Sequence, residues 1–155
     1  MEKIQMSKAD PKFKYEVAGK PGAENIKKCF SCGTCTSGCP VFQVESGYNP
    51  RRIIRMVLLG LREKVLASKM IWLCAQCYAC TANCPQEVSF ADIMTVLRDM
   101  AIEEGHAAPD ILEKIETITA AANEFRKDSI NLITGEGEAT KEQIKEKVDS
   151  AIKKL

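Results

Sequence analysis

The chain has 155 residues, of which 45% are hydrophobic, enough for one compact domain with a modest core. Its 22 basic and 21 acidic residues leave a formal net charge of +1, so no overall charge favours binding to nucleic acid or to an anionic membrane. Residues 1–17 alternate charged and apolar side chains and lack the apolar stretch of a secretion signal. We therefore expect a cytoplasmic, reducing location, where paired cysteines serve as metal ligands or redox groups more often than as disulfides.

Residues 1–22 are predicted to form an N-terminal arm ahead of the first domain. The segment is polar and contains prolines and glycines, which favour irregular structure. Its apolar residues Phe13, Tyr15 and Val17 alternate with polar ones. This pattern indicates a short edge strand or an extended segment that lies on a partner.

Two copies of one cysteine pattern, C-x2-C-x2-C-x3-C-P, follow the arm and use all eight cysteines of the chain. The first copy contains Cys29, Cys32, Cys35 and Cys39, and the second contains Cys74, Cys77, Cys80 and Cys84. In such a run three close thiolates hold one [4Fe-4S] cluster, and the fourth cysteine reaches the other cluster. The pattern therefore predicts two [4Fe-4S] clusters with exchanged ligands. One set is Cys29, Cys32, Cys35 and Cys84, and the other is Cys74, Cys77, Cys80 and Cys39.

Structural zinc is the alternative for eight cysteines, because two four-cysteine zinc sites need the same number of ligands. Zinc modules usually supply separated C-x2-C pairs rather than triplets followed by C-P, so the spacing favours iron–sulfur clusters. The zinc alternative would make the chain a structural or interaction module. A disulfide framework is disfavoured because the sequence shows no secretion signal.

The segment between the two cysteine runs predicts a helix. Pro50 suits the first helical turn, and apolar residues recur at helical spacing over residues 51–67. Three arginines crowd the start of this helix: Arg51, Arg52 and Arg55. They form a solvated face, form a docking patch for an acidic partner surface, or compensate the charge of a cluster. The most apolar window, residues 53–61, is far shorter than the roughly 18 residues that cross a bilayer, so no direct membrane insertion is expected.

Two amphipathic helices are predicted after the second cysteine run. The first begins near Ser89 or Asp92 and ends at Gly105, and the second begins at Pro109. Small two-cluster ferredoxins have a largely β frame, whereas these helices predict an all-α fold built around the two cysteine loops. The cluster-binding domain is expected to cover residues 23–106.

Residues 107–155 are predicted to form a C-terminal helical extension. Glycines indicate a linker near residues 128–139. Beyond the linker, Thr140 and Gln143 have the spacing of a capping box, which predicts the start of a last helix.

Three segments carry a resemblance to a known family. They are C-F-S-C-G-T-C-T-S-G-C-P from Cys29, N-P-R-R-I-I-R-M-V-L-L-G-L from Asn49, and I-W-L-C-A-Q-C-Y-A-C-T-A-N-C-P from Ile71 with the helix that follows. The chain resembles the α-helical ferredoxins, and most closely the C subunits of heterodisulfide reductases. The cysteine runs alone would also suit the helical iron–sulfur domain of succinate dehydrogenase relatives, but the R-R-I-I-R and I-W-L-C segments are more particular.

The resemblance implies a non-catalytic electron-transfer subunit of an oxidoreductase complex in anaerobic metabolism. In the family, this subunit relays electrons between a flavin-containing A subunit and a B subunit that reduces a heterodisulfide, and the eight cysteines are cluster ligands. The chain has no Cys-Cys-Gly segment like those of the B subunit, so disulfide reduction is expected on a partner. It also has no G-x-G-x-x-G motif for a flavin or nicotinamide. An iron–sulfur relay subunit of another flavin-linked reductase or dehydrogenase is the alternative host.

Overall fold

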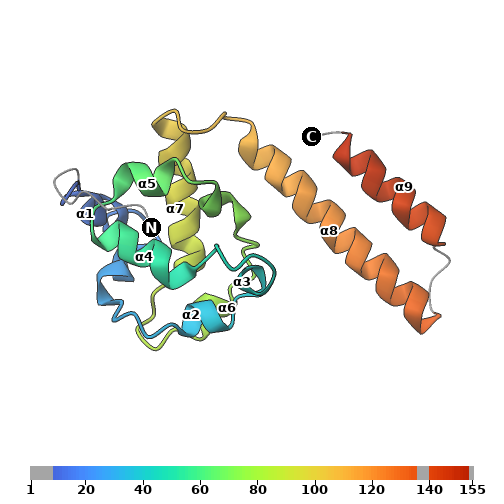
Figure 1. Cartoon of the computed structure of the whole chain (residues 1–155), viewed down its shortest axis with the longest axis horizontal. Coiled ribbons are helices and arrows are strands. Elements are labelled where there is room, and N and C mark those ends of the chain that lie inside the picture. Colours follow the sequence, from blue (N-terminus) through green and yellow to red (C-terminus); the bar gives the residue numbers. More distant parts are fainter. Residues whose placement is uncertain (1–8, 136–139, 154–155) are drawn as a thin grey trace. The chain divides into compact units, whose positions relative to one another are not determined.

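The computed structural model describes residues 9–135 and 140–153 (Figure 1). These residues form α-helices, 3-10 helices and turns, and no strand occurs among them, which confirms the all-α prediction. The chain divides into two compact units, residues 1–107 and 108–155.

The first unit contains nine short elements in chain order: α1 (Phe13–Ala18), η2 (Glu24–Lys28), α2 (Thr34–Ser37), α3 (Pro40–Val44), α4 (Pro50–Leu58), α5 (Arg62–Leu66), η3 (Lys69–Leu73), α6 (Ala79–Ala82) and α7 (Phe90–Glu103). The second unit contains α8 (Ile111–Thr134) and α9 (Lys141–Ile152). These elements are the ones found in the described residues of each unit.

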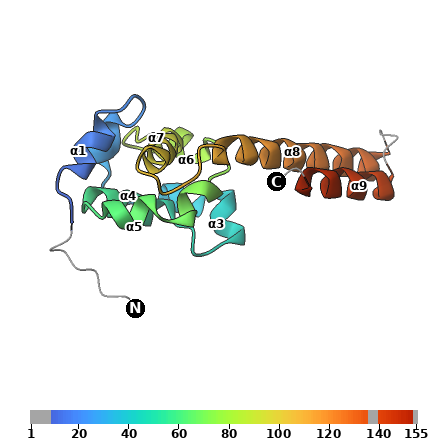
Figure 2. The ribbon, with the colours of Figure 1, turned by 90° about the horizontal axis from the view of Figure 1, so that it is seen from above.

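Helix α7 is central to the core of the first unit, and α1, α5, η3 and α6 all contact it (Figure 2). Its residues Ile93, Met94 and Leu97 are fully buried and belong to a core that also includes Phe13 and Ile71. Burying a side chain of this size stabilises the fold by roughly 1.5–3 kcal/mol relative to leaving it in water. The core therefore lies next to the second cysteine loop, because that loop connects η3 to α6 and both elements contact α7.

The N-terminal segment is helical, so the predicted edge strand or extended segment is wrong. Helix α1 buries Phe13 and Val17, which are four residues apart and share one helical face. Tyr15 lies on the other side and is 58% exposed. Three alternating apolar residues fit a strand or one turn of helix equally well, and contact with the core decides between them. Residues 1–8 of the predicted arm lie outside the described residues.

The helix predicted over residues 51–67 is interrupted at Gly60, which has a φ of 75°. Helix α4 ends before this glycine and α5 begins after it. The amide of Asp10 donates a 2.7 Å hydrogen bond to the Gly60 carbonyl, and a Cβ at Gly60 would collide with the Asp10 backbone. Glycine is therefore required by this close approach of the N-terminal segment, and its left-handed conformation ends the helix.

The second unit is an antiparallel helical hairpin in which α8 and α9 lie side by side (Figures 1 and 2). Helix α8 continues to Thr134 and ends at Gly135, which has a φ of 72°. The linker predicted near residues 128–139 is therefore wrong for residues 128–134, and residues 136–139 lie outside the described residues. Asp128 explains the difference, because its side chain is buried against α9 rather than placed in a loop.

The start of α9 confirms the predicted capping box. The Gln143 amide donates to the Thr140 hydroxyl at 3.3 Å, and the Thr140 amide donates to the Gln143 side chain at 2.9 Å. These two bonds satisfy donors that the first helical turn leaves free.

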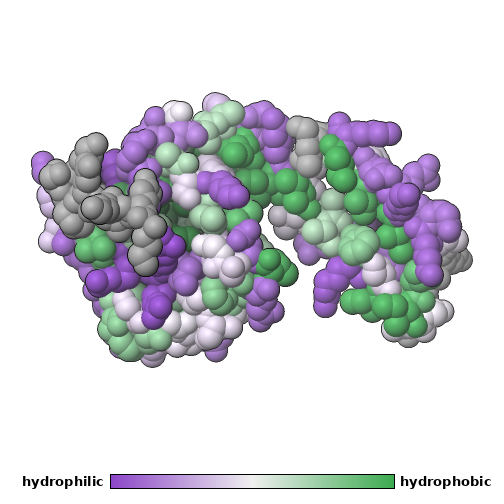
Figure 3. All heavy atoms as spheres, in the orientation of Figure 1, coloured by the Kyte–Doolittle hydropathy of each residue, from purple (hydrophilic) through white to green (hydrophobic). Residues whose placement is uncertain are grey.

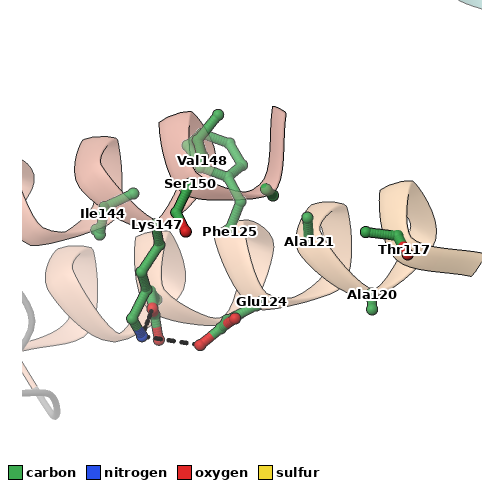
Figure 4. Close-up of a pocket in the computed structure, with 11 residues that line it drawn as sticks. Thr117, Ala120, Ala121, Glu124, Phe125, Ile144, Lys147, Val148 and Ser150 are labelled. Atoms are coloured by element: carbon green, nitrogen blue, oxygen red, sulfur yellow. Dashed lines mark hydrogen bonds and ion pairs between the residues drawn. The ribbon is translucent and has the colours of Figure 1, made fainter. Parts of the chain in front are cut away.

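A groove of about 440 Å³ runs between α8 and α9, and Lys147 crosses it to reach both Glu124 and Asp128 at 2.8 Å (Figure 4). Apolar surface also remains exposed on this hairpin (Figure 3), with Phe125 and Ile118 each about half exposed. The hairpin thus combines an ion-pair network around the buried Asp128 with an apolar surface that its own two helices do not cover.

Candidate metal centre

The two cysteine runs fold into the same local structure twice. Each run begins after a 3-10 helix, η2 or η3, passes through a loop, and continues into a one-turn helix, α2 or α6. Corresponding elements are 45 residues apart in the sequence. Helices α2 and α6 contact each other, so the two halves of the sequence repeat meet within the first unit (Figure 1).

Matching positions of the two loops have positive φ angles. These are Ser31 (63°) and Gly33 (93°) in the first loop, and Gln76 (46°) and Tyr78 (59°) in the second. Turns that contain left-handed residues gather successive backbone N–H groups into a concave surface that binds anions and iron–sulfur clusters. Tyr78 adopts this conformation where the first loop has glycine, which is strained for a bulky residue, and its hydroxyl donates to Asp92 at 3.2 Å.

All eight cysteines are free of disulfide bonds. The second cysteine of each run, Cys32 and Cys77, is exposed, and the other six are partly buried. Each run therefore presents one thiol at the surface and holds three closer to the core.

Cys84 lies near the first cysteine run rather than standing apart from it. Burial raises the pKa of the Cys35 thiol, and the negative charges of Cys29, Cys32 and Cys84 raise it further. The charged neighbours of Cys35 are thus two cysteines of its own run and the last cysteine of the other run. The amide of Val88 donates to the Cys84 sulfur at 3.3 Å.

The second set of thiols surrounds the phenol of Tyr48. Burial raises the pKa of Cys80 to about 11, with Cys74 and Cys77 as charged neighbours. Burial also raises the pKa of Tyr48 well above its usual range, and the charges of Cys74, Cys39 and Cys80 add to this effect. Cys39 of the first run is therefore grouped with cysteines of the second run around one buried side chain.

Three buried hydroxyl groups in or near these loops lack a hydrogen-bond partner of full geometry: Ser31, Tyr48 and Thr81. No other described side chain has a buried nitrogen or oxygen atom without such a partner. Ser31 belongs to the first loop, Thr81 directly follows Cys80, and Tyr48 neighbours the second set of thiols. An unsatisfied buried polar group costs about 1–3 kcal/mol, so each is expected to have a partner in the functional protein. Cluster sulfur atoms accept such bonds. The residues present therefore fit an iron–sulfur group.

Comparison with known proteins agrees with this chemistry. Residues 25–88 match the 4Fe-4S dicluster domain family. Among curated relatives, the C subunit of the H(2):CoB-CoM heterodisulfide,ferredoxin reductase of Methanothermobacter thermautotrophicus is 32% identical over 106 residues, covering 68% of this chain and 56% of the relative. The C 2 iron-sulfur subunit of the CoB–CoM heterodisulfide reductase of Methanocaldococcus jannaschii is 41% identical over 92 residues, covering 59% of this chain and 48% of the relative.

A third relative, the C subunit of the ferredoxin:CoB-CoM heterodisulfide reductase of Methanosarcina acetivorans, is 44% identical over 85 residues, covering 55% of this chain and 34% of the relative. The chain is a homologue of heterodisulfide reductase C subunits. It spans about half the length of the curated relatives it matches.

In this C-subunit homologue, a buried arginine of α7 holds the start of the second cysteine run. Arg98 is 3% exposed, and its guanidinium donates to the carbonyl oxygens of Ile71 at 2.9 Å, Trp72 at 3.3 Å and Cys74 at 2.8 Å. Burial lowers the pKa of Arg98, while negative charge on Cys74 acts in the opposite direction and raises it. A guanidinium stays protonated near neutral pH. Helix α7 therefore fixes the backbone that leads into Cys74, the first cysteine of this run.

Sequence reasoning missed Arg98 and Tyr48. A signal was present for Arg98, because it lies four residues after Met94, within the apolar face of the predicted helix. A charged residue at such a position is rarely buried without a specific set of partners. No comparable signal marks Tyr48, which follows a glycine in a segment with the composition of a turn.

The three arginines at the start of α4 lie beside the first loop. Together with Cys29, Phe30, Ser31 and Asn49 they line a hollow of about 600 Å³. Arg51, Arg52 and Arg55 are all exposed, and none forms an ion pair with any described residue. The surface next to the first cysteine run is therefore strongly basic.

The thiols of each ligand set are neighbours without forming a compact site for a single metal ion. Within residues 9–135 and 140–153, no three His, Cys, Asp or Glu side chains are gathered as ligands of one metal ion. The assignment of cysteines to clusters therefore rests on their spacing and on which thiols are neighbours. None of the described helices combines the length and apolar character needed to cross a membrane.

Proposed function

We propose that this chain binds two [4Fe-4S] clusters and relays single electrons between partner subunits. The ligands of one cluster are Cys29, Cys32, Cys35 and Cys84, and those of the other are Cys74, Cys77, Cys80 and Cys39. The observation that carries this proposal is the contact between α2 and α6, which brings two matched cysteine loops together. Buried hydroxyl groups without a hydrogen bond of full geometry lie in or next to these loops. The dicluster-domain match and the named relatives support it.

A [4Fe-4S] cluster, when bound, supplies a site that gains and loses one electron. The protein contributes the surroundings. Six partly buried thiols and the core beneath them restrict water, and the Val88 amide donates to the Cys84 sulfur. The exposed positions of Cys32 and Cys77 leave a short route from each ligand set to a docked partner. Hydrogen bonds and solvent exposure of this kind set the reduction potential of a cluster.

The proposed partners are a flavin-containing A-type subunit and a catalytic B-type subunit that reduces a disulfide, in a cytoplasmic complex. The support is that the relatives are named as C subunits of heterodisulfide reductases. The unpaired arginines beside the first loop suit an acidic surface on one of these partners. A relay role in another flavin-linked reductase or dehydrogenase keeps the same clusters and changes only the partners.

Metal analysis tests the cluster proposal. Protein purified without oxygen is expected to contain about eight irons and about eight acid-labile sulfides per chain, as two such clusters require. It should be brown and give an electron paramagnetic resonance signal after reduction. Stoichiometric zinc without sulfide would contradict the proposal and favour a zinc-bound structural module.

Purification of the native complex tests the relay proposal separately. A flavin-containing subunit and a cysteine-rich catalytic subunit are expected to co-purify with this chain. A stable assembly that contains neither would count against the heterodisulfide reductase assignment while leaving the clusters in place.

A further inference from the structure

The second ligand set lies next to a buried positive charge. Arg98 is 3% exposed, and all three of its hydrogen bonds go to backbone carbonyl oxygens, including that of Cys74. Among the described residues it forms no ion pair with a carboxylate. Because the surroundings are apolar, this charge acts on nearby groups much more strongly than an exposed charge would.

The same ligand set also lies next to a buried hydroxyl group. Tyr48 is fully buried with Cys74, Cys39 and Cys80 as neighbours, and its hydroxyl lies close to the Cys74 side chain but forms no hydrogen bond of full geometry with any protein group. A phenol is protonated near neutral pH, so Tyr48 offers an O–H donor to sulfur. Thr81, directly after Cys80, offers a second one.

The first ligand set has fewer available hydroxyl donors and no buried positive charge of this kind among the described residues next to it. Thr36 occupies the place that Thr81 has in the second run, and each threonine lies beside the thiol of the cysteine before it. The Thr36 hydroxyl, however, already donates to Asn49 Oδ1 at 3.1 Å and accepts from the Arg51 amide at 3.1 Å. Ser31 is the one buried hydroxyl without a partner in the described first loop. The arginines beside this loop are exposed, so solvent and salt screen their charges.

We propose that Tyr48 and Arg98 make the cluster of the second run the one with the higher reduction potential, so that it accepts electrons from the cluster of the first run. The inference rests on the proposed function, since it needs both clusters to be bound. In the transfer one electron leaves the first cluster, which is oxidised, and enters the second, which is reduced; no bond forms and no proton moves. The added negative charge is stabilised by a nearby guanidinium and by O–H donors.

The isosteric change Tyr48→Phe tests the inference, because it removes only the hydroxyl. The full chain, purified without oxygen, is titrated with a reductant and followed by electron paramagnetic resonance to obtain two midpoint potentials. Tyr48→Phe is expected to shift the higher potential downward and to leave the lower one unchanged. Ser31→Ala is expected to shift only the lower potential downward. Tyr15→Phe, at a residue on α1 that is 58% exposed, is the matched control and should shift neither.

Two results for Tyr48→Phe would overturn the inference. One is a shift of the lower potential, and the other is no change in either potential. Arg98→Met should also shift the higher potential downward, and Arg98→Lys should restore most of that shift by returning the charge. Arg98→Met removes three buried hydrogen bonds and could prevent folding. In that case the result for Tyr48→Phe alone tests the inference. Protein without iron and sulfide would overturn the proposed function as well, whereas clusters that do not respond to Tyr48→Phe overturn this inference alone.

Discussion

The side chain of Cys84 lies near enough to Cys35 to raise the pKa of the Cys35 thiol, although the two residues belong to different cysteine runs. The contact between α2 and α6 brings these parts of the chain together. Ligand exchange between the runs would therefore tie the two loops to each other through the clusters as well as through the core. Because metal binding and folding are linked in small sites of this kind, loss of one cluster should loosen both loops.

Alanine variants of four cysteines test the exchange. Cys29→Ala and Cys84→Ala should lose the same electron paramagnetic resonance signal, because both residues are assigned to one cluster. Cys74→Ala and Cys39→Ala should lose the other signal. The measurement is a spectrum of each reduced variant together with its iron content. Ligation within each run predicts instead that Cys84→Ala loses the signal lost in Cys74→Ala, and this result would refute the exchange.

The basic surface beside the first loop should contribute to partner binding. Replacing Arg51, Arg52 and Arg55 together by Gln is expected to weaken complex formation roughly tenfold at low salt, from about 0.5 kcal/mol for each exposed charge. The difference from the unchanged protein should shrink as salt is added. Binding to the purified partner subunits at several salt concentrations measures the effect.

A matched control for this variant is available on the second unit. Arg126, Lys141 and Lys145 are exposed cations on α8 and α9, and changing them to Gln removes the same charge elsewhere. This second variant should bind as the unchanged protein does. Equal affinity of both variants would mean that the three arginines of α4 form only a solvated face.

Gly60 should be one of the least replaceable glycines in the chain. Gly60→Ala is expected to destabilise the first unit by about 3 kcal/mol, because alanine at this φ is strained and its Cβ would collide with the Asp10 backbone. Gly105 has the same φ of 75°, but a Cβ there would meet no atom within 4 Å, so Gly105→Ala should cost only about 1 kcal/mol. Midpoints of anaerobic urea unfolding give the comparison, and equal effects would rule out the collision.

The cysteine spacing predicted the 4Fe-4S chemistry that the dicluster-domain match supports, because ligand geometry restricts the distance along the chain between thiolates that share a cluster. The division of the eight cysteines between two clusters stays a prediction. The spacing of Thr140 and Gln143 likewise predicted a helix start, since a capping box is a local interaction. The predictions that were wrong concern structure that depends on contacts between distant segments. The break at Gly60 comes from Asp10, and the helical state of Phe13 and Val17 comes from packing on a core that short-range patterns do not reveal.

The buried groups of the site were beyond sequence reasoning for the same reason. Arg98 reaches carbonyl oxygens more than 20 residues earlier in the chain. Tyr48 acquires its thiol neighbours only when both cysteine runs are in place. Neither relationship leaves a local pattern, so a pattern that indicates candidate ligands does not reveal the residues that surround them.

Asp128 should make the stability of the α8–α9 hairpin depend on pH. The Lys147 ammonium holds the pKa of Asp128 below its usual value of about 3.9, and Asp128 in turn raises the pKa of Lys147 above about 10.4. The contribution of Asp128 is therefore present above pH of about 4 and is lost as the pH falls through its lowered pKa. That of Lys147 is present below pH of about 10 and is lost as the pH rises further.

Hydrogen exchange of peptides from α9, corrected for intrinsic rates, measures this dependence in the full chain. Protection should fall below pH of about 4 in the unchanged protein, and Asp128→Asn should lower protection at neutral pH and remove most of the acid-dependent loss. Glu124→Gln is the matched control, because Glu124 contacts Lys147 at the same 2.8 Å but its side chain is 47% exposed, against 6% for Asp128. The control should retain most of the protection and the acid-dependent loss, since an exposed ion pair contributes little. An Asp128→Asn variant with unchanged protection at neutral pH would show that the hairpin is held by its apolar contacts alone.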